Sequence, residues 1–65
     1  MKKNKFIKHL RENGCFPTGR QKGSHAWFRN TLTGKATVVP MHNDIDDLTC
    51  SAICKQLGIP YPGKN

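Results

Sequence analysis

Apolar residues recur with a helical period near the start of the chain. Within residues 4–13 they form one stripe, made of Phe6, Ile7 and Leu10, while charged residues occupy the positions between them. Asn4 is a favourable N-cap, and Asn13-Gly14 supplies a stop at which glycine adopts the left-handed C′ conformation. The pattern therefore predicts a first helix over residues 4–13.

A second helix is predicted over residues 49–57. Its core-type positions are Ala52, Ile53, Gln56 and Leu57, and its candidate caps are Asp46, Asp47 and Thr49. Leu48 is a candidate hydrophobic staple before the first turn. Gly58 has the place of a C′ glycine, and Pro60 follows as a stop.

Residues between the two helices alternate with the period of a strand. Over residues 24–30, Ala26 and Phe28 point to one face, and the other face carries His25, Trp27 and Arg29. Residues 31–34 form a turn containing glycine, and residues 35–39 return as a strand that ends before Pro40. These features predict a β-hairpin.

Residues 15–23 carry a weaker pattern. Cys15-Phe16 is a short extended piece halted by Pro17, which makes it an edge strand or an interrupted one. Residues 18–23 are polar and basic, contain two glycines and show neither a helical nor a strand period. We therefore predict a mobile loop there.

The element order is therefore helix, short strand, strand, strand, helix. Strands grouped between helices predict an α+β fold, with a three-stranded antiparallel sheet and both helices on one face. A chain of 65 residues has room for one domain, with a core over about residues 4–59 and a short frayed tail over 60–65.

The charge of the chain narrows the range of partners. Eleven Lys and Arg residues against four acids give a net charge of +7, which favours nucleic acid, an acidic protein or an anionic membrane. The membrane is the weakest of these, because no apolar run approaches the roughly 18 residues of a spanning helix. The basic start also lacks the apolar segment of a secretory signal, so we expect a cytoplasmic protein.

The cysteines and the clustered acids are candidate metal ligands. The three cysteines, Cys15, Cys50 and Cys54, are an odd number that favours a reducing compartment over a disulfide framework. Cys50 and Cys54 lie one helical turn apart, but their spacing matches no usual zinc pattern and suits small buried hydrophobes. Three of the four acids, Asp44, Asp46 and Asp47, precede the second helix, where capping and the helix dipole account for them. We therefore expect neither a metal nor a cofactor.

The segment from Lys22 to Arg29 is the strongest candidate for chemistry. RNA cleavage without a metal needs a base that takes the 2′-hydroxyl proton, and His25 suits this role because histidine titrates near neutral pH. The backbone around Gly23 and Ser24 can approach a phosphate, and Lys22 and Arg29 supply positive charge where negative charge develops.

Further residues extend this candidate site. Trp27 offers a plane on which a base can stack, and Arg20 adds positive charge from the basic loop. The group that protonates the leaving oxygen is open among Lys22, Arg29 and His42. His9 lies among basic residues on the first helix, on a solvated face or a phosphate-contacting patch.

Three motifs in order make the chain resemble a known family. They are Gly23-Ser24-His25 followed by Trp27-Phe28, then Val39-Pro40-Met41-His42, then Ile53-Cys54-Lys55-Gln56-Leu57-Gly58-Ile59. With an N-terminal amphipathic helix that ends in Asn13-Gly14, they resemble the HicA toxin family over roughly residues 5–59.

The resemblance implies a double-stranded-RNA-binding-domain-like fold and a ribosome-independent mRNA endoribonuclease that arrests translation. It implies a HicB antitoxin partner that covers the active site, with the toxin a monomer when alone. The catalytic histidine of the family carries over to His25, and no metal is implied for turnover. Many members have a second histidine directly after the first, where this chain has Ala26.

Two other readings remain open. The same charge and the same aromatic residue suit an RNA-binding or partner-binding module without catalysis. A regulatory subunit that acts only through an acidic partner would bind that partner tightly and have no affinity for RNA.

Overall fold

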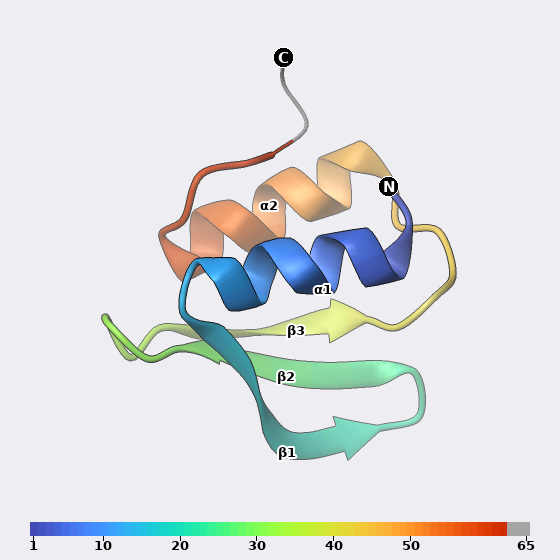
Figure 1. The fold of residues 1–65 in the computed structure, drawn as a ribbon. Coiled ribbons are helices and arrows are strands. Elements are labelled where there is room, and N and C mark those ends of the chain that lie inside the picture. The colour runs from blue at the N-terminus through green and yellow to red at the C-terminus, as the bar shows by residue number, and fades with distance from the viewer. Residues whose placement is uncertain (63–65) are drawn as a thin grey trace.

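The computed structural model describes residues 1–62 and has the predicted order of elements. The elements are α1 (Lys3–Glu12), β1 (Cys15–Lys22), β2 (His25–Asn30), β3 (Ala36–Pro40) and α2 (Asp47–Leu57). The strands form an antiparallel sheet in the order β1-β2-β3, and both helices cover one face of it (Figure 1). The α+β prediction is confirmed, and the other face of the sheet is open.

Strand β1 is longer than its sequence pattern predicts. Pro17 does not halt it, and the predicted loop over residues 18–23 is wrong, because the chain stays extended as far as Lys22. Pro17 is tolerated because β1 is an edge strand, and the pairing with β2 shifts register between Pro17 and Gln21. Only Cys15 of this strand is buried, so the rest has no apolar alternation to read.

Helix α1 begins without the predicted Asn4 cap. The residues before it pair instead with the connection that leads to α2: the Lys3 N–H donates to the Asn43 carbonyl at 2.9 Å, and the Ile45 N–H donates to the Met1 carbonyl at 2.9 Å. This backbone pairing supplies an acceptor that a cap would otherwise provide. Phe6 and Leu10 are buried as predicted, and Gly14 adopts a left-handed conformation with φ of +81°.

Helix α2 begins two residues earlier than predicted. Asp46 is its N-cap, as one of the candidates: its carboxylate accepts from the Thr49 N–H at 3.4 Å and from the Thr49 hydroxyl at 2.6 Å. The predicted end is confirmed, since Gly58 is left-handed and the Ile59 N–H donates to the Cys54 carbonyl at 3.0 Å.

The predicted buried face of α2 is partly wrong. Leu48 is no staple, because it lies in the first helical turn with 83% of its surface exposed, and Ala52 and Gln56 also face solvent. The buried positions are Cys50, Ile53, Cys54 and Leu57. This i, i+3, i+4, i+7 spacing appears once cysteine is counted as a hydrophobe.

The core lies between the helices and the covered face of the sheet. It consists of Phe6, Leu10, Cys15, Ala26, Phe28, Val39, Ile45, Cys50, Ile53, Cys54 and Leu57. One polar residue, Asn30, is buried with them: its amide donates to the Leu57 carbonyl at 2.8 Å and accepts from the Leu32 N–H at 2.9 Å. Among residues 1–62 no buried side-chain nitrogen or oxygen lacks a partner.

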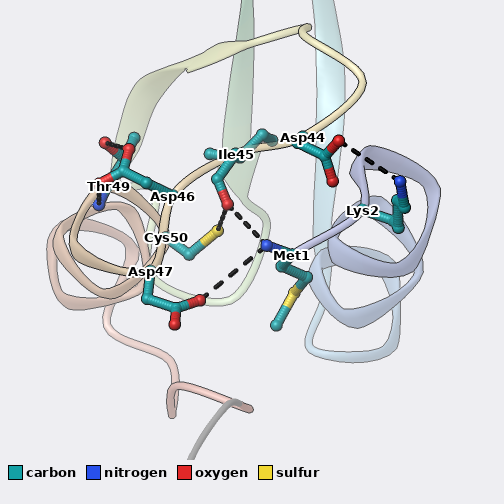
Figure 2. Close-up of polar contacts among 8 residues, drawn as sticks. All are labelled: Met1, Lys2, Asp44, Ile45, Asp46, Asp47, Thr49 and Cys50. Atoms are coloured by element: carbon teal, nitrogen blue, oxygen red, sulfur yellow. Dashed lines mark hydrogen bonds and ion pairs between the residues drawn. The ribbon is translucent and has the colours of Figure 1, made fainter.

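The acid cluster belongs to the junction between the chain start and α2 (Figure 2). The Met1 ammonium donates to the Ile45 carbonyl at 2.7 Å and lies 3.9 Å from an Asp47 oxygen. Lys2 Nζ lies 3.3 Å from Asp44 Oδ2. Figure 2 shows these contacts tying the start of α1 to the start of α2, so the acids serve the fold.

The chain after α2 folds back toward α1. Ile59 and Tyr61 pack against the core, and the His9 Nε2–H donates to the Pro60 carbonyl at 2.7 Å. A frayed tail is therefore the wrong description for Tyr61, while residues 63–65 of that prediction lie outside the described residues. His9 has a structural partner, which accounts for its place on α1.

Candidate nucleic-acid interface

The open face of the sheet carries the predicted side chains of β2. Ala26, Phe28 and Asn30 are 5%, 2% and 2% exposed on the helix-covered side, whereas His25 and Arg29 are exposed and Trp27 is half-buried. This alternation is the expected one, so His25, Trp27 and Arg29 share the open face. Ala26, between His25 and Trp27, points into the core.

The hairpin turn at residues 23–24 positions His25 beside a lysine. Lys22 and His25 are directly paired across β1 and β2, which leaves a two-residue turn. Gly23 has φ of +58°, as the first central residue of a type II′ turn requires, and a Cβ added there would meet nothing within 4 Å. The turn geometry alone therefore explains Gly23. Gly23 is exposed at the tip of the hairpin, whereas Ser24 is half-buried and its carbonyl accepts from the Met41 N–H at 2.6 Å.

Cations on this face have no carboxylate partners. Among residues 1–62, the ion pairs are those of the Met1 ammonium with Asp47 and of Lys2 with Asp44. Arg20, Lys22 and Arg29 are exposed and take part in neither. Their positive charge is therefore available to a ligand.

Arg20 and Trp27 meet in a groove on the open face. The Arg20 guanidinium lies 4.8 Å from the centre of the Trp27 ring, a cation–π distance. The groove has a volume of about 550 Å³, and its lining includes Phe16, Arg29 and Thr31. Phe16 is 40% exposed, and the Arg11 guanidinium lies 5.8 Å from its ring centre.

His25 lines a different groove, at the edge of the sheet. That groove has a volume of about 380 Å³ and runs between β3 and α2, where its lining includes Val38, Pro40, Leu48 and Ile53. Because Arg29 is four positions along β2 from His25, their separation is roughly 13 Å at strand spacing. The structure thus brings Lys22 next to His25 and puts Arg29 with Trp27 instead.

The sequence pattern did not indicate Phe16, which lines the open-face groove, or Arg11, whose guanidinium lies beside the Phe16 ring. Phe16 was assigned only to a short strand, and Arg11 only to the solvated end of a helix. Their meeting depends on the way the end of α1 passes over β1, and no local pattern carries that information. The cross-strand pairing of Phe16 with Arg29 is likewise visible only once β1 is known to be a strand.

The three cysteines are not placed for chemistry, because all of them are buried. Burial raises the pKa of the Cys54 thiol to about 11, so it stays protonated at neutral pH, and Cys15 and Cys50 are also fully buried. His42 is exposed in the connection after β3. Over residues 1–62, no three His, Cys, Asp or Glu side chains come together as metal ligands. None of the helices described over that range is long and apolar enough to cross a bilayer.

The fold and the face together define a class. Helix-strand-strand-strand-helix order, an open sheet and unpaired cations on that sheet describe a small double-stranded-RNA-binding-domain-like protein. The family model described as HicA toxin of bacterial toxin-antitoxin matches residues 4–59. The chain therefore belongs to the HicA toxin family, as its motifs predicted, and is a toxin of a toxin-antitoxin system. Searches of curated proteins and of solved structures gave no match.

Proposed function

We propose that this toxin is a metal-independent endoribonuclease that cleaves mRNA in the cytoplasm, with His25 as the general base. The observation that carries the proposal is the position of His25. It is exposed on the open sheet face, beside the Gly23-Ser24 turn and directly across from Lys22.

The reaction follows from these positions. His25 takes the proton of a 2′-hydroxyl, the O2′–P bond forms, and the P–O5′ bond breaks as a proton reaches the leaving oxygen. The products are a 2′,3′-cyclic phosphate and a 5′-hydroxyl. Lys22 is the direct cross-strand neighbour of His25, which puts the Cβ atoms of the two residues about 5 Å apart. Its ammonium group stabilises the negative charge that develops on the phosphate.

The leaving oxygen needs a proton donor near this phosphate. Lys22 is better placed than Arg29, which lies several strand positions away along β2. His42 lies two residues after Pro40, the last residue of β3 and the partner of His25, so it stays a second candidate from the connection after that strand.

The partner that restrains the toxin is proposed to be a HicB-type antitoxin. The toxin alone is a monomer, and the complex is a hetero-oligomer in which the antitoxin covers His25. A net charge of +7 with unpaired cations on the open face favours an acidic partner surface there.

The proposal is tested by incubating labelled mRNA with the purified toxin in EDTA. The wild-type protein should cleave, and His25→Ala should lower the rate by about 100-fold or more, the usual contribution of a general base. His9→Ala is the matched control at a histidine outside the site, since His9 lies on α1 and bonds to the Pro60 carbonyl. Thermal unfolding should show that both variants remain folded.

Each alternative has its own outcome in this assay. Cleavage by His25→Ala near the wild-type rate would refute the role of His25, and cleavage only with a divalent ion would refute the metal-independent reaction. RNA that is bound but stays intact would identify a non-catalytic RNA-binding module. Absence of both binding and cleavage would favour a subunit that acts through a protein partner.

A further inference from the structure

The open-face groove contains two aromatic rings, and each has an arginine beside it. Arg20 lies 4.8 Å from the Trp27 ring centre, and Arg11 lies 5.8 Å from the Phe16 ring centre. Phe16 is 40% exposed, whereas the phenylalanines of the core, Phe6 and Phe28, are 0% and 2% exposed. Phe16, Trp27 and Arg20 line the groove, and Arg11 lies beside it next to the Phe16 ring. Aromatic rings with guanidinium groups next to them are the chemistry that binds unpaired nucleobases.

The two rings lie at separate positions along one track. Phe16 pairs with Arg29 across the strands, so Trp27, two residues before Arg29, is its diagonal neighbour at about 7–8 Å. His25 lies two residues further along β2, about 7 Å beyond Trp27 and away from Phe16. The order along the sheet is therefore His25, Trp27, Phe16.

We propose that this groove binds two successive unpaired bases of single-stranded RNA next to the scissile phosphate. The nearer base stacks on the outer face of the Arg20 guanidinium, which the Trp27 ring supports from below. The further base stacks on Phe16, with Arg11 beside it. That the ligand is RNA rests on the proposed function. The inference adds that this RNA is single-stranded and names the residues that hold its bases.

Base-paired RNA does not fit this arrangement. Stacking on a protein ring requires a base that has left its own stack, which favours loops, ends and single strands. The basic residues around the groove contact phosphates in either case, so base stacking is the distinguishing interaction.

The protein carries a built-in probe, because Trp27 is its single tryptophan. The experiment titrates the toxin with a short 2′-O-methyl oligonucleotide of mixed sequence, which lacks the attacking hydroxyl and is not cleaved. Trp27 fluorescence should be quenched on binding. An oligonucleotide of equal length whose residues are abasic should bind much more weakly and leave the fluorescence unchanged.

Two variants separate stacking from charge. Phe16→Leu keeps an apolar side chain without the ring, and Arg20→Lys keeps the charge without the plane. Each should weaken binding of the base-bearing oligonucleotide by about tenfold, as loss of one stacked base does, while the salt dependence stays the same. Lys35→Gln, outside the groove, is the control that alters charge alone.

The outcomes distinguish this inference from the proposed catalysis. Equal binding of the abasic and base-bearing oligonucleotides, or wild-type affinity in both variants, would overturn the stacking site even if mRNA is cleaved. Base-dependent quenching without any cleavage of mRNA would support the stacking site and refute the nuclease. No binding and no cleavage would overturn both.

Discussion

The two sides of the sheet differ in whether their polar and charged side chains have partners within the fold. On the helix-covered side the buried polar side chain, Asn30, bonds to the end of α2, and Asp46 caps the start of that helix. On the open side, Arg20, Lys22 and Arg29 form no ion pair with any other residue from 1 to 62. Arg29 and Asn30 are neighbours in the chain, yet one is exposed and the other is 2% exposed.

Charged groups that cap a helix or form ion pairs stabilise the fold, whereas the unpaired cations of the open face are available to a ligand. Three of the four acids lie at the start of α2, where Asp46 caps the helix and Asp44 and Asp47 pair with the chain start. The fourth, Glu12, ends α1 and is in neither ion pair, so no acid of residues 1–62 is paired with an open-face cation. Like charges gathered on one surface repel, so their placement lowers stability and raises the attraction for a polyanion.

The largest expected effect is the loss of RNA binding when open-face charge is removed. Replacing Arg20, Lys22 and Arg29 together with Gln should weaken RNA binding by about 10- to 100-fold at low salt. The slope of log K against log salt should become shallower by up to about 2, since each phosphate contact with a single strand contributes about 0.7. Anisotropy titrations at several salt concentrations measure both.

A matched control removes three charges from the helices. Replacing Lys5, Lys8 and Lys55 with Gln gives the same net charge, and all three residues are exposed away from the sheet. Binding should change far less in this variant. An equal loss would show that overall charge, rather than the open face, governs binding.

The next effect is on stability and comes from the buried amide. Asn30→Ala should lower the free energy of unfolding by about 2–3 kcal/mol, because the Leu57 carbonyl and the Leu32 N–H lose their partner. Arg29→Ala, one residue away, should cost less than about 0.5 kcal/mol. Urea unfolding of both variants measures the difference, and equal costs would contradict the division between the two sides.

Loss of the α2 cap should have a smaller effect. Asp46→Ala removes the bonds from Thr49 and should lower the midpoint of thermal unfolding by a few degrees, with RNA affinity unchanged. The hydrogen bond from the Thr49 hydroxyl holds the pKa of this carboxyl below its ordinary value of 3.8. A lowered pKa stabilises the fold above the ordinary value, and this contribution is lost as the pH falls through the lowered one.

The difference in melting midpoint between wild type and Asp46→Ala should therefore be constant near neutral pH and shrink below about pH 4. Asp44→Ala is the control, since it removes an acid of the same turn that caps nothing. A difference that grew on acidification would contradict the capping role.

The smallest effect is expected from the exposed ion pair at the chain start. Lys2→Gln breaks the contact with Asp44. Because the two side chains are 76% and 66% exposed, the free energy of unfolding should fall by less than about 0.5 kcal/mol. Urea unfolding at low and high salt checks this value. A cost comparable to that of Asn30→Ala would show that this exposed pair stabilises the junction far more than its solvation allows.

How much the sequence could predict depended on whether an element has one buried face. Strand β2 alternates strictly between core and solvent, so its pattern predicted which side His25, Trp27 and Arg29 share. Strand β1 is exposed at every position after Cys15, and its polar residues were therefore mistaken for a loop. The start of α1 was misassigned because its acceptor is the backbone of Asn43, which lies 40 residues away in the chain.

The candidate site was predictable only in part for the same reason. Lys22 and His25 are close in the sequence and meet across a short turn, so their proximity could be expected. The pairing of Arg11 with Phe16 and of Arg20 with Trp27 depends on the path of α1 over β1 and on the register shift in β1. Long-range packing of this kind leaves no periodic trace in the sequence.

The most direct test of the account is the chemistry of the ends left on cleaved mRNA. Mass analysis of products formed in EDTA should find 2′,3′-cyclic phosphates and 5′-hydroxyls with the wild-type toxin, and neither product with His25→Ala. Cleavage products that carry 3′-hydroxyls and 5′-phosphates, or cyclic phosphates formed equally well by His25→Ala, would contradict a reaction in which His25 activates the 2′-hydroxyl.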